Sequence, residues 1–385
     1  MNNFEFYNPV RILFGDEYLS KLATYIPADK KILLLFGGGS IKRNGVYDTA
    51  VKALEGRSLI EFGGIDPNPS YEQCMEVVAL IKEEKADYVL ALGGGSVIDA
   101  AKFIAAAALY EGKDPWHILS RAVPVKNSLP LGCVLTLPAT GTEMNGNSVI
   151  SRHSTQEKFA FSSPYSFPQF SVLMPGAAGT LPQRQVANGV VDAFVHVIEQ
   201  YLTYPADAPV QDRFAESILT TLIEEGPKVL EKPGDYTLMS KLMWSATMAL
   251  NGLISCGVPT DWATHTIGHE LTALYNIDHA RTLAIVLPGM WRVLKDEKAE
   301  KLLQYAERVW NISEGSPESR IDKAISDTEE FFNSLGVKTR LPDYKLGDDV
   351  PGLIADRFEK RRWKEMGDRK LVTPDIVKKI LSDRL

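Results

Sequence analysis

Histidines gather in one short stretch of this chain. Three of the six histidines among its 385 residues are His265, His269 and His279. Imidazole nitrogens are common ligands of Zn²⁺ and Fe²⁺. A metal held by three or four protein ligands, with one position open, is a Lewis acid that polarises a carbonyl or stabilises an alkoxide. The stretch therefore predicts a metal centre for carbonyl or alcohol chemistry.

A carboxylate and a fourth histidine lie upstream, in a segment with helical spacing. Asp192 and His196 are four residues apart and so share one helix face. An isolated Asp/His pair on a helix more often forms a surface hydrogen bond. Together with the downstream histidines, however, this pair completes a ligand set for one Fe²⁺ or Zn²⁺ ion. The spacing leaves open whether His265 or His269 is the ligand. Because Glu270 follows His269, the H-E-x-x-H pattern of metalloproteases is absent.

Two Gly-Gly-Gly-Ser loops are candidates to bind the phosphates of a nucleotide. They span residues 37–40 and 93–96, and each follows a short apolar run. Glycine lets a ligand approach the backbone closely, and the helix N-terminus that follows offers N–H groups to a phosphate. One such loop is a weak signal because tight turns also use glycine, and neither loop matches G-x-G-x-x-G. Two of them in successive strand–helix units favour a dinucleotide site.

The first loop also bears on which dinucleotide is bound. Ser40 is followed by Lys42 and Arg43, and no acid is present to hold the ribose 2′-hydroxyl of NAD. Cationic or small polar groups admit a 2′-phosphate, so the loop favours NADP(H), with NAD(H) as the alternative. A solvated helix start would explain Lys42 and Arg43 equally well.

The elements that carry these residues change character near residue 180. Before it, apolar runs at 31–36, 88–92 and 132–137 lack alternation, which is typical of strands buried on both faces, and a helical segment spans 71–85. Strands alternating with helices predict a parallel sheet. We therefore predict an α/β domain with a parallel, Rossmann-like sheet at 1–180 and an all-α domain at 181–385. Helical spacing in the second domain covers 186–202, 212–230, 238–254, 260–275, 298–310 and 319–335, 283–287 is ambiguous, and the charged end from Asp343 is expected at the surface.

Bulk properties argue against several classes of partner. The net charge of −7 disfavours a nucleic-acid partner, which would usually need a basic face. No apolar run reaches the roughly 18 residues of a membrane helix, and no signal peptide is visible. The three cysteines form no C-x-x-C pair, which fits a reducing compartment. We expect a cytoplasmic enzyme that acts on a small molecule, without a nucleic-acid or membrane partner.

Motifs spread along the chain match one family. They are Phe-Tyr-Asn-Pro (6–9), Phe-Gly-Gly-Ile-Asp-Pro-Asn-Pro (62–69), Gly-Gly-Gly-Ser-Val-Ile-Asp (93–99), Leu-Pro-Ala-Thr-Gly-Thr-Glu (137–143), and the stretches 182–199 and 265–282. The chain resembles the iron-containing (group III) alcohol dehydrogenases over essentially its whole length, especially the NADP-dependent aldehyde reductase and butanol dehydrogenase branch. The resemblance implies a dehydroquinate synthase-like fold. It further implies one divalent metal, Fe²⁺ or Zn²⁺, held by Asp192, His196, His265 and His279, with His269 near the nicotinamide as a catalytic candidate.

The same resemblance implies which residues bind the cofactor. The phosphate-binding positions of relatives correspond to Gly94, Gly95, Ser96 and Asp99, and the 2′-phosphate region corresponds to Gly38 and Ser40, with Gly39 between them. The stretch that lines the cofactor cleft in relatives corresponds to Thr136, Thr140, Asn145, Asn147 and Lys158.

The implied function is hydride transfer between NADP(H) and short- to medium-chain aliphatic aldehydes or alcohols, by a homodimer. A lyase like dehydroquinate synthase is a rival, but it would need a cluster of cations for its substrate, and no matching cluster is visible among Arg213, Arg281 and Arg292. Glycerol dehydrogenase-like activity is a nearer rival. A non-catalytic regulator that binds metal and nucleotide is a third alternative, which an NADPH oxidation assay with short aldehydes would separate from the enzymes.

Overall fold

The computed structural model describes residues 1–385, which form two compact units. The first, called the α/β unit below, comprises Tyr7–Pro182 and Lys232–Thr247. The second, called the helical unit, comprises Met1–Phe6, Gln183–Glu231 and Met248–Leu385. The glycine loops belong to the α/β unit and the Asp/His cluster belongs to the helical unit.

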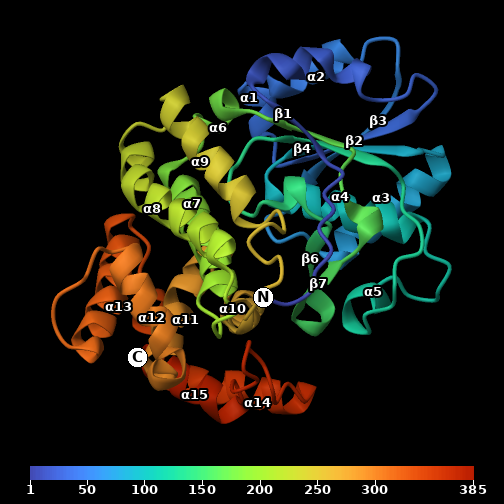
Figure 1. Ribbon diagram of the computed structural model, residues 1–385. Coiled ribbons are helices and arrows are strands. Elements are labelled where there is room, and N and C mark those ends of the chain that lie inside the picture. Colours follow the sequence, from blue (N-terminus) through green and yellow to red (C-terminus); the bar gives the residue numbers. More distant parts are fainter. The chain divides into compact units, whose positions relative to one another are not determined.

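A six-stranded sheet forms the centre of the α/β unit, with all neighbouring strands parallel (Figure 1). The apolar runs at 31–36, 88–92 and 132–137 are confirmed as strands, and β4 is buried along its whole length. Three further strands were not predicted, because they are short or carry exposed side chains that mask the pattern. In spatial order the sheet consists of β1 (Arg11–Phe14), β8 (Phe170–Leu173), β5 (Leu131–Leu135), β4 (Tyr88–Gly93), β2 (Lys31–Gly37) and β3 (Ser58–Ile65).

Helices cover both faces of this sheet. One face packs into a core with the 3₁₀ helix η1 (Asp16–Thr24), α1 (Ser40–Arg43) and α2 (Val46–Ala53). On the other side, α4 (Gly95–Ala108) packs on β4 and β5 and lies beside α3 (Tyr71–Glu84) (Figure 1). The antiparallel hairpin of β6 (Asn147–Arg152) and β7 (Glu157–Ser162) also packs on α4, which is therefore almost entirely buried. The unit also contains the short helices α5 (His117–Ser120) and α6 (Pro175–Ala178).

Helix α9 (Tyr236–Ala249) follows the boundary expected from the sequence, yet most of it groups with the α/β unit. The indole of Trp244 meets the ring of Phe14 edge to face, with centroids 6.1 Å apart, and Thr247 donates a hydrogen bond to the Glu143 carboxylate. The two compact units thus differ from the predicted domains 1–180 and 181–385 at α9 and at Met1–Phe6, and the predicted domain boundary stays a prediction. Helical spacing shows which face of α9 is apolar but not which neighbour buries it.

The helical unit consists of eight α-helices around its own core. Helix α7 packs against α8 and α11, and α10 packs against α11, so the helices that carry the Asp/His cluster are direct neighbours. The ambiguous run 283–287 lies in the buried interior of α11. The bounds are α7 (Gln183–Tyr201), α8 (Pro209–Glu231), α10 (Ala263–Tyr275), α11 (His279–Val293), α12 (Lys295–Arg308), α13 (Pro317–Ser334), α14 (Val350–Arg361) and α15 (Pro374–Ser382).

The expectation of surface structure from Asp343 onward is correct for residues 343–349 and 362–371, which are exposed or half-buried, but wrong for α14 and α15. Ile380 and Leu381 of α15 are fully buried, and so is Arg384 next to the C-terminal residue. The Arg384 guanidinium pairs with Glu329 on α13 and donates to the Thr339 carbonyl, so the end of the chain is anchored in the core of the unit. A parallel sheet followed by a mostly helical remainder confirms the predicted fold class. No helix in the structure has the length and apolar character that crossing a bilayer requires.

Candidate metal centre and cofactor loops

Three helices bring the Asp/His cluster together in the helical unit. Asp192 and His196 lie on α7, His265 on α10, and His279 is the first residue of α11. Ligand atoms of Asp192, His265 and His279 all lie within 4.8 Å of one another. The Nε2 atoms of His196 and His279 are each 3.9 Å from Asp192 Oδ1. The rings of His196 and His265 stack with centroids 4.7 Å apart, so His196 borders this group of three residues.

The donor set of this cluster fits a divalent cation. Asp192 and His196 are 4% and 6% exposed, and their atoms Oδ1 and Nδ1 are buried without a hydrogen-bond partner. Burial of such groups is costly unless a partner compensates for the lost water. Burial also lowers the pKa of His196 to about 4, against the opposing charge of Asp192, so the imidazole is neutral at neutral pH and its lone pair can bind a metal. A cation among these groups would satisfy them.

His269 lies next to this cluster but outside the three-residue group with mutually close ligand atoms. Its ring centroid is 5.0 Å from that of His279 and 6.4 Å from that of His265. The choice between His265 and His269, which spacing left open, is thereby narrowed by geometry: His265 shares the short ligand distances with Asp192 and His279. His269 borders the same space and is only partly buried.

Glu199 is a site residue that the sequence analysis missed. It is 2% exposed and lies on α7, three residues after His196. Its carboxylate accepts the backbone N–H of Thr264 at 2.7 Å and that of His265 at 3.1 Å, and it contacts His265 Nδ1. With Nδ1 engaged by a carboxylate, Nε2 is the His265 nitrogen left to bind a metal. Burial raises the pKa of Glu199 to about 7, although the N–H donors of Thr264 and His265 oppose this rise.

The residues that precede α10 and α11 are also fixed by polar contacts. Asp278, just before His279, accepts hydrogen bonds from Arg184 Nε and Asn188 Nδ2, both at 2.7 Å. Asp261, close before α10, accepts from the Ala263 N–H at 3.0 Å and pairs with the buried ammonium of Lys298 at 2.7 Å. The helix starts that carry His265 and His279 are therefore held by charges outside the cluster itself.

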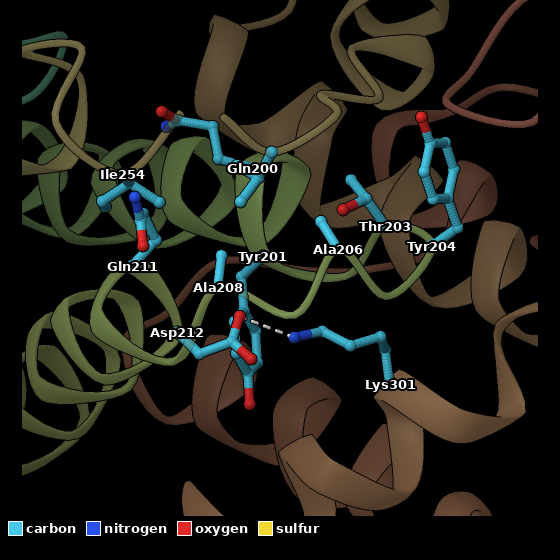
Figure 2. Close-up of a pocket in the computed structure, with 11 residues that line it drawn as sticks. Gln200, Tyr201, Thr203, Tyr204, Ala206, Ala208, Gln211, Asp212, Ile254 and Lys301 are labelled. Carbon is cyan, nitrogen blue, oxygen red and sulfur yellow. Dashed lines mark hydrogen bonds and ion pairs between the residues drawn. The ribbon is translucent and has the colours of Figure 1, made fainter. Parts of the chain in front are cut away.

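A small pocket at the C-terminal end of α7 is separate from the Asp/His cluster (Figure 2). None of the four cluster residues lines it. Its charged groups are satisfied within the protein, because Lys301 Nζ is 2.8 Å from Asp212 Oδ1 and lies 4.1 Å from the Tyr201 ring centroid. Gln200 likewise donates to the carbonyls of His196 and Ala249. We interpret this pocket as part of the structural packing between α7, α8 and α12.

In the α/β unit, the predicted cofactor loops lie at the carboxyl edge of adjacent strands. Strand β4 pairs with β2 on one side and with β5 on the other. The loops after them carry Gly38, Gly39 and Ser40, then Gly94, Gly95 and Ser96, then Thr136 and Thr140. From β2 the chain continues to β3 on one side of the sheet, and from β4 it continues to β5 on the opposite side. The direction of strand order therefore reverses between β2 and β4. Ligands of open α/β sheets bind at this kind of reversal.

Glycine has different roles in the two loops. Gly39 has a φ of +89° and open space where a side chain would start, so the first loop is a tight turn with an accessible backbone. At Gly95, a Cβ atom would lie 2.5 Å from Thr140 Oγ1, so the start of α4 touches the loop after β5 directly. The first helical residue of α4 is Gly95, and no side chain caps this end of the helix. Its N–H groups are thus available to a phosphate.

The side chains of Asp99 and Asn145 face into the protein and not toward the loop edge, and so does the backbone carbonyl of Asn147. Asp99 accepts hydrogen bonds from Thr142 Oγ1 at 2.6 Å and from the Val149 N–H at 3.0 Å. Oxygens of Asn145 and Asn147 surround the ammonium of Lys102, a residue that the sequence analysis missed. Burial lowers the pKa of Lys102 to about 8, opposed by the charge of Asp99, so the group is still mostly a cation at neutral pH.

Ser96 and Lys158, from segments far apart in the sequence, meet at one residue that was not predicted. The Asn68 N–H donates to Ser96 Oγ at 3.3 Å, and the Asn68 side chain accepts from the buried Lys158 ammonium at 2.8 Å. Asn68 adopts a left-handed backbone conformation with a φ of 56°, which asparagine tolerates better than most residues. Its position in the Asp-Pro-Asn-Pro motif could have indicated Asn68 as a site residue in the sequence analysis.

Comparison with known proteins shows the family. The model of the iron-containing alcohol dehydrogenases matches residues 9–175, and the model of the Fe-containing alcohol dehydrogenase C-terminal region matches residues 186–384. The NADPH-dependent aldehyde reductase YqhD of Escherichia coli (strain K12) is 55% identical over 383 residues, 99% of each chain. The probable NADH-dependent butanol dehydrogenase 1 of Bacillus subtilis (strain 168) is 41% identical over 362 residues, 93% of each chain. The crystal structure of E. coli K-12 YqhD superposes with a TM-score of 0.98 at 53% identity, covering 100% of this chain and 99% of that one.

This chain belongs to the iron-containing alcohol dehydrogenase family. The family and the enzyme class predicted from the sequence motifs are confirmed: the protein is an oxidoreductase of the alcohol dehydrogenase type.

Proposed function

We propose that the protein reduces short- to medium-chain aliphatic aldehydes with NADPH, and oxidises the corresponding alcohols in the reverse direction. The observation that carries this proposal is the convergence of Asp192, His265 and His279 within 4.8 Å, in a chain 55% identical to an NADPH-dependent aldehyde reductase. The alignment extends over nearly the whole of both chains, so it includes the loops to which we assign the cofactor.

We assign the metal to Asp192, His196, His265 and His279, with Fe²⁺ and Zn²⁺ as the candidate ions. A divalent cation held by these residues supplies Lewis acidity for the carbonyl oxygen of the substrate. Around it, Asp192 contributes a buried negative charge, and Glu199 engages Nδ1 of His265, so we assign Nε2 as the ligand atom of this histidine. His269 borders the cluster, and we assign to its imidazole the delivery of a proton to the product oxygen.

We assign the cofactor to the loop edge of the α/β unit. NADPH supplies the hydride when it is bound. In this assignment the backbone of Gly94, Gly95 and Ser96 holds phosphate at the start of α4, and Thr136 and Thr140 line the same edge. Gly38, Gly39 and Ser40 accommodate the 2′-phosphate. Lys42 supports a preference for NADPH over NADH, although its ammonium already lies 4.5 Å from the Tyr47 ring centroid. Because the B. subtilis relative is named for NADH, both cofactors are included in the test of this preference.

We also propose that the protein acts as a homodimer in a reducing compartment such as the cytoplasm. Support for the dimer comes from exposed aromatic side chains of the helical unit, Phe4, Phe6 and Phe214, which are 45–50% exposed. Support for the compartment comes from the cysteines, because Cys74, Cys133 and Cys256 are all buried and form no disulfide. Analytical ultracentrifugation of the purified protein tests the first point.

The function is tested by metal analysis of the purified protein together with the oxidation of NADPH and NADH on a panel of aldehydes. We expect one bound divalent ion per chain and a preference for NADPH. His265→Ala should lose both the metal and turnover. A metal-free His265→Ala protein that reduces butanal near the wild-type rate would refute the site, and a metal-loaded wild type inactive on every aldehyde would point to the non-catalytic regulator.

A further inference from the structure

The side chain of Lys102 is enclosed by oxygen atoms. Lys102 lies on α4 and is 0% exposed. Its Nζ lies 2.6 Å and 2.8 Å from the carbonyl and hydroxyl oxygens of Thr142, 2.7 Å and 3.1 Å from the carbonyl and amide oxygens of Asn145, and 2.7 Å from the Asn147 carbonyl. An ammonium has only three N–H bonds to share among these five acceptors. The arrangement resembles the coordination shell of a monovalent cation more than an ordinary salt bridge.

Every one of these oxygens comes from the segment that follows β5. Three are backbone carbonyls that point toward the interior and need a donor there. Asp99, one helical turn before Lys102, holds the same segment through Thr142 Oγ1 and the Val149 N–H. Thr142 Oγ1 therefore donates to Asp99 and accepts from Lys102. Two buried, opposite charges on consecutive turns of α4 fasten the segment to the helix.

The fastened segment meets the start of the same helix. Thr140 comes so close to Gly95 that a side chain at Gly95 would overlap it. Residues 142–147 are joined to Thr140 by only a few residues of backbone. A displacement of residues 142–147 would thus also displace the residues to which the cofactor is assigned. Without the ammonium, the carbonyls of Thr142, Asn145 and Asn147 would lose the donor that they share, and the segment would have to move.

We propose that Lys102 is a positioning residue for dinucleotide binding, an internal cation that fixes the Thr140–Asn147 segment against the start of α4. This inference rests on the proposed function, because it assumes that this loop edge of the α/β unit binds NADPH. The alternative is that Lys102 contributes to global stability alone, as any well-paired buried charge does.

The test compares Lys102→Met with Lys301→Met. Both substitutions remove a buried ammonium, but Lys301 belongs to the helical unit, where it pairs with Asp212. NADPH binding is followed by fluorescence titration, local order by hydrogen exchange of the 140–149 peptide, and stability by thermal unfolding. We expect the NADPH Kd of Lys102→Met to rise at least tenfold, with faster exchange at 140–149, whereas Lys301→Met should bind NADPH like the wild type at a similar loss of stability.

A chemical rescue makes the role of the cation explicit. Lys102→Ala leaves a cavity in which propylammonium would replace the missing end of the side chain. We expect propylammonium to restore NADPH affinity at least severalfold, and 1-propanol, a neutral molecule with the same number of heavy atoms, to have no effect. If Lys102→Met and Lys102→Ala fail to fold, Thr142→Val and Thr142→Ser replace them, and only the valine variant, which loses the shared hydroxyl, should weaken binding.

Two results would overturn the inference. One is an NADPH Kd that is unchanged in folded Lys102→Met, or in folded Thr142→Val where that variant is used. The other is an equal rise of the Kd in the Lys102 and Lys301 variants, which would assign Lys102 to stability alone. A wild-type protein that binds no dinucleotide would instead refute the proposed function, so the two failures are distinguishable.

Discussion

Glu199 engages His265 at two atoms, the backbone N–H at 3.1 Å and the ring nitrogen Nδ1. The carboxylate thus fixes both the start of α10 and the tautomer of the imidazole. Outer partners of this kind orient metal ligands, and their loss typically costs about 10–100-fold in metal affinity. We predict a loss of this size for Glu199→Gln, measured as the metal Kd by competition with a chelator. Glu216→Gln, which removes a buried carboxylate of α8, should leave the metal Kd unchanged, and a Glu199→Gln protein with wild-type affinity would contradict this role.

His269 and His265 should respond differently to the same substitution. His265→Ala removes a proposed ligand, whereas His269→Ala leaves all four proposed ligands in place. A positioned general acid contributes roughly 10²–10⁴-fold to rate. We expect His269→Ala to retain its metal and to lose kcat by about that factor, as measured by steady-state kinetics and metal analysis of the same sample. Loss of metal on removal of His269 would make it a ligand and would end its assignment as a proton donor.

Ser40 offers a test of the cofactor preference. It is the exposed first residue of α1, directly after the turn at Gly39. A carboxylate there would repel the 2′-phosphate and could accept a hydrogen bond from the 2′-hydroxyl of NADH. We predict that Ser40→Asp raises the KM for NADPH by about tenfold, the effect of roughly 1.4 kcal/mol of lost binding, and changes the KM for NADH much less. Ser20→Asp adds the same charge on η1 and is the control. Equal changes with both cofactors would remove this loop from 2′-phosphate recognition.

The ion pair at the end of the chain predicts a dependence of stability on pH. Burial alone would raise the pKa of Glu329, but the hydrogen bond from Arg292 and the charge of Arg384 outweigh it, so this pKa lies below its ordinary value of 4.5. A lowered carboxylate pKa stabilises the fold above the unfolded-state pKa, and this contribution is lost as the pH falls through the folded-state value.

We therefore expect Glu329→Gln to lower the free energy of unfolding by about 2 kcal/mol at pH 7, because the buried Arg384 loses one of its two carboxylate partners and keeps only Asp383. The difference from wild type should shrink once the pH falls below about 4.5. Denaturant unfolding at several pH values measures it. Glu318→Gln removes an exposed partner of Lys295 and should cost no more than about 1 kcal/mol at any pH. A constant difference between the Glu329 variant and wild type from pH 7 to pH 3 would exclude the ion pair as its source.

Sequence patterns correctly predicted the helices and strands whose apolar residues follow a regular local spacing. Helical spacing gave α7, α10 and α12 to within a few residues, and unbroken apolar runs gave β2, β4 and β5. Strand β3 was missed because exposed residues interrupt its apolar ones, and β1 and β8 because each has only four residues. The end of the chain was misjudged because its charges suggested solvent, whereas Arg384 is neutralised by Glu329, 55 positions upstream.

In the candidate site, too, residues related by local spacing could be predicted, whereas residues that act through contacts between distant segments could not. Asp192 and His196 share a helix face by spacing alone, and the histidine cluster is visible in the sequence. Glu199 also shares that face with His196, three residues on, but its importance depends on the contact between α7 and α10. Lys102 was hidden in an alanine-rich apolar stretch, and only the fold brings the carbonyls of residues 142–147 around it.

The placement of α9 has a consequence for how the chain is made. Lys232–Thr247 belongs to the α/β unit, so a ribosome must deliver the chain well past the sheet, through α7 and α8, before that unit has all its parts. Until then Phe14 and Glu143 lack Trp244 and Thr247 as neighbours. Domains usually fold in the order in which they are synthesised. Here the N-terminal α/β unit is complete only after Lys232–Thr247 has been translated, and α7 and α8 of the helical unit are translated before that segment. Its maturation during translation is therefore tied to that of the metal-binding half.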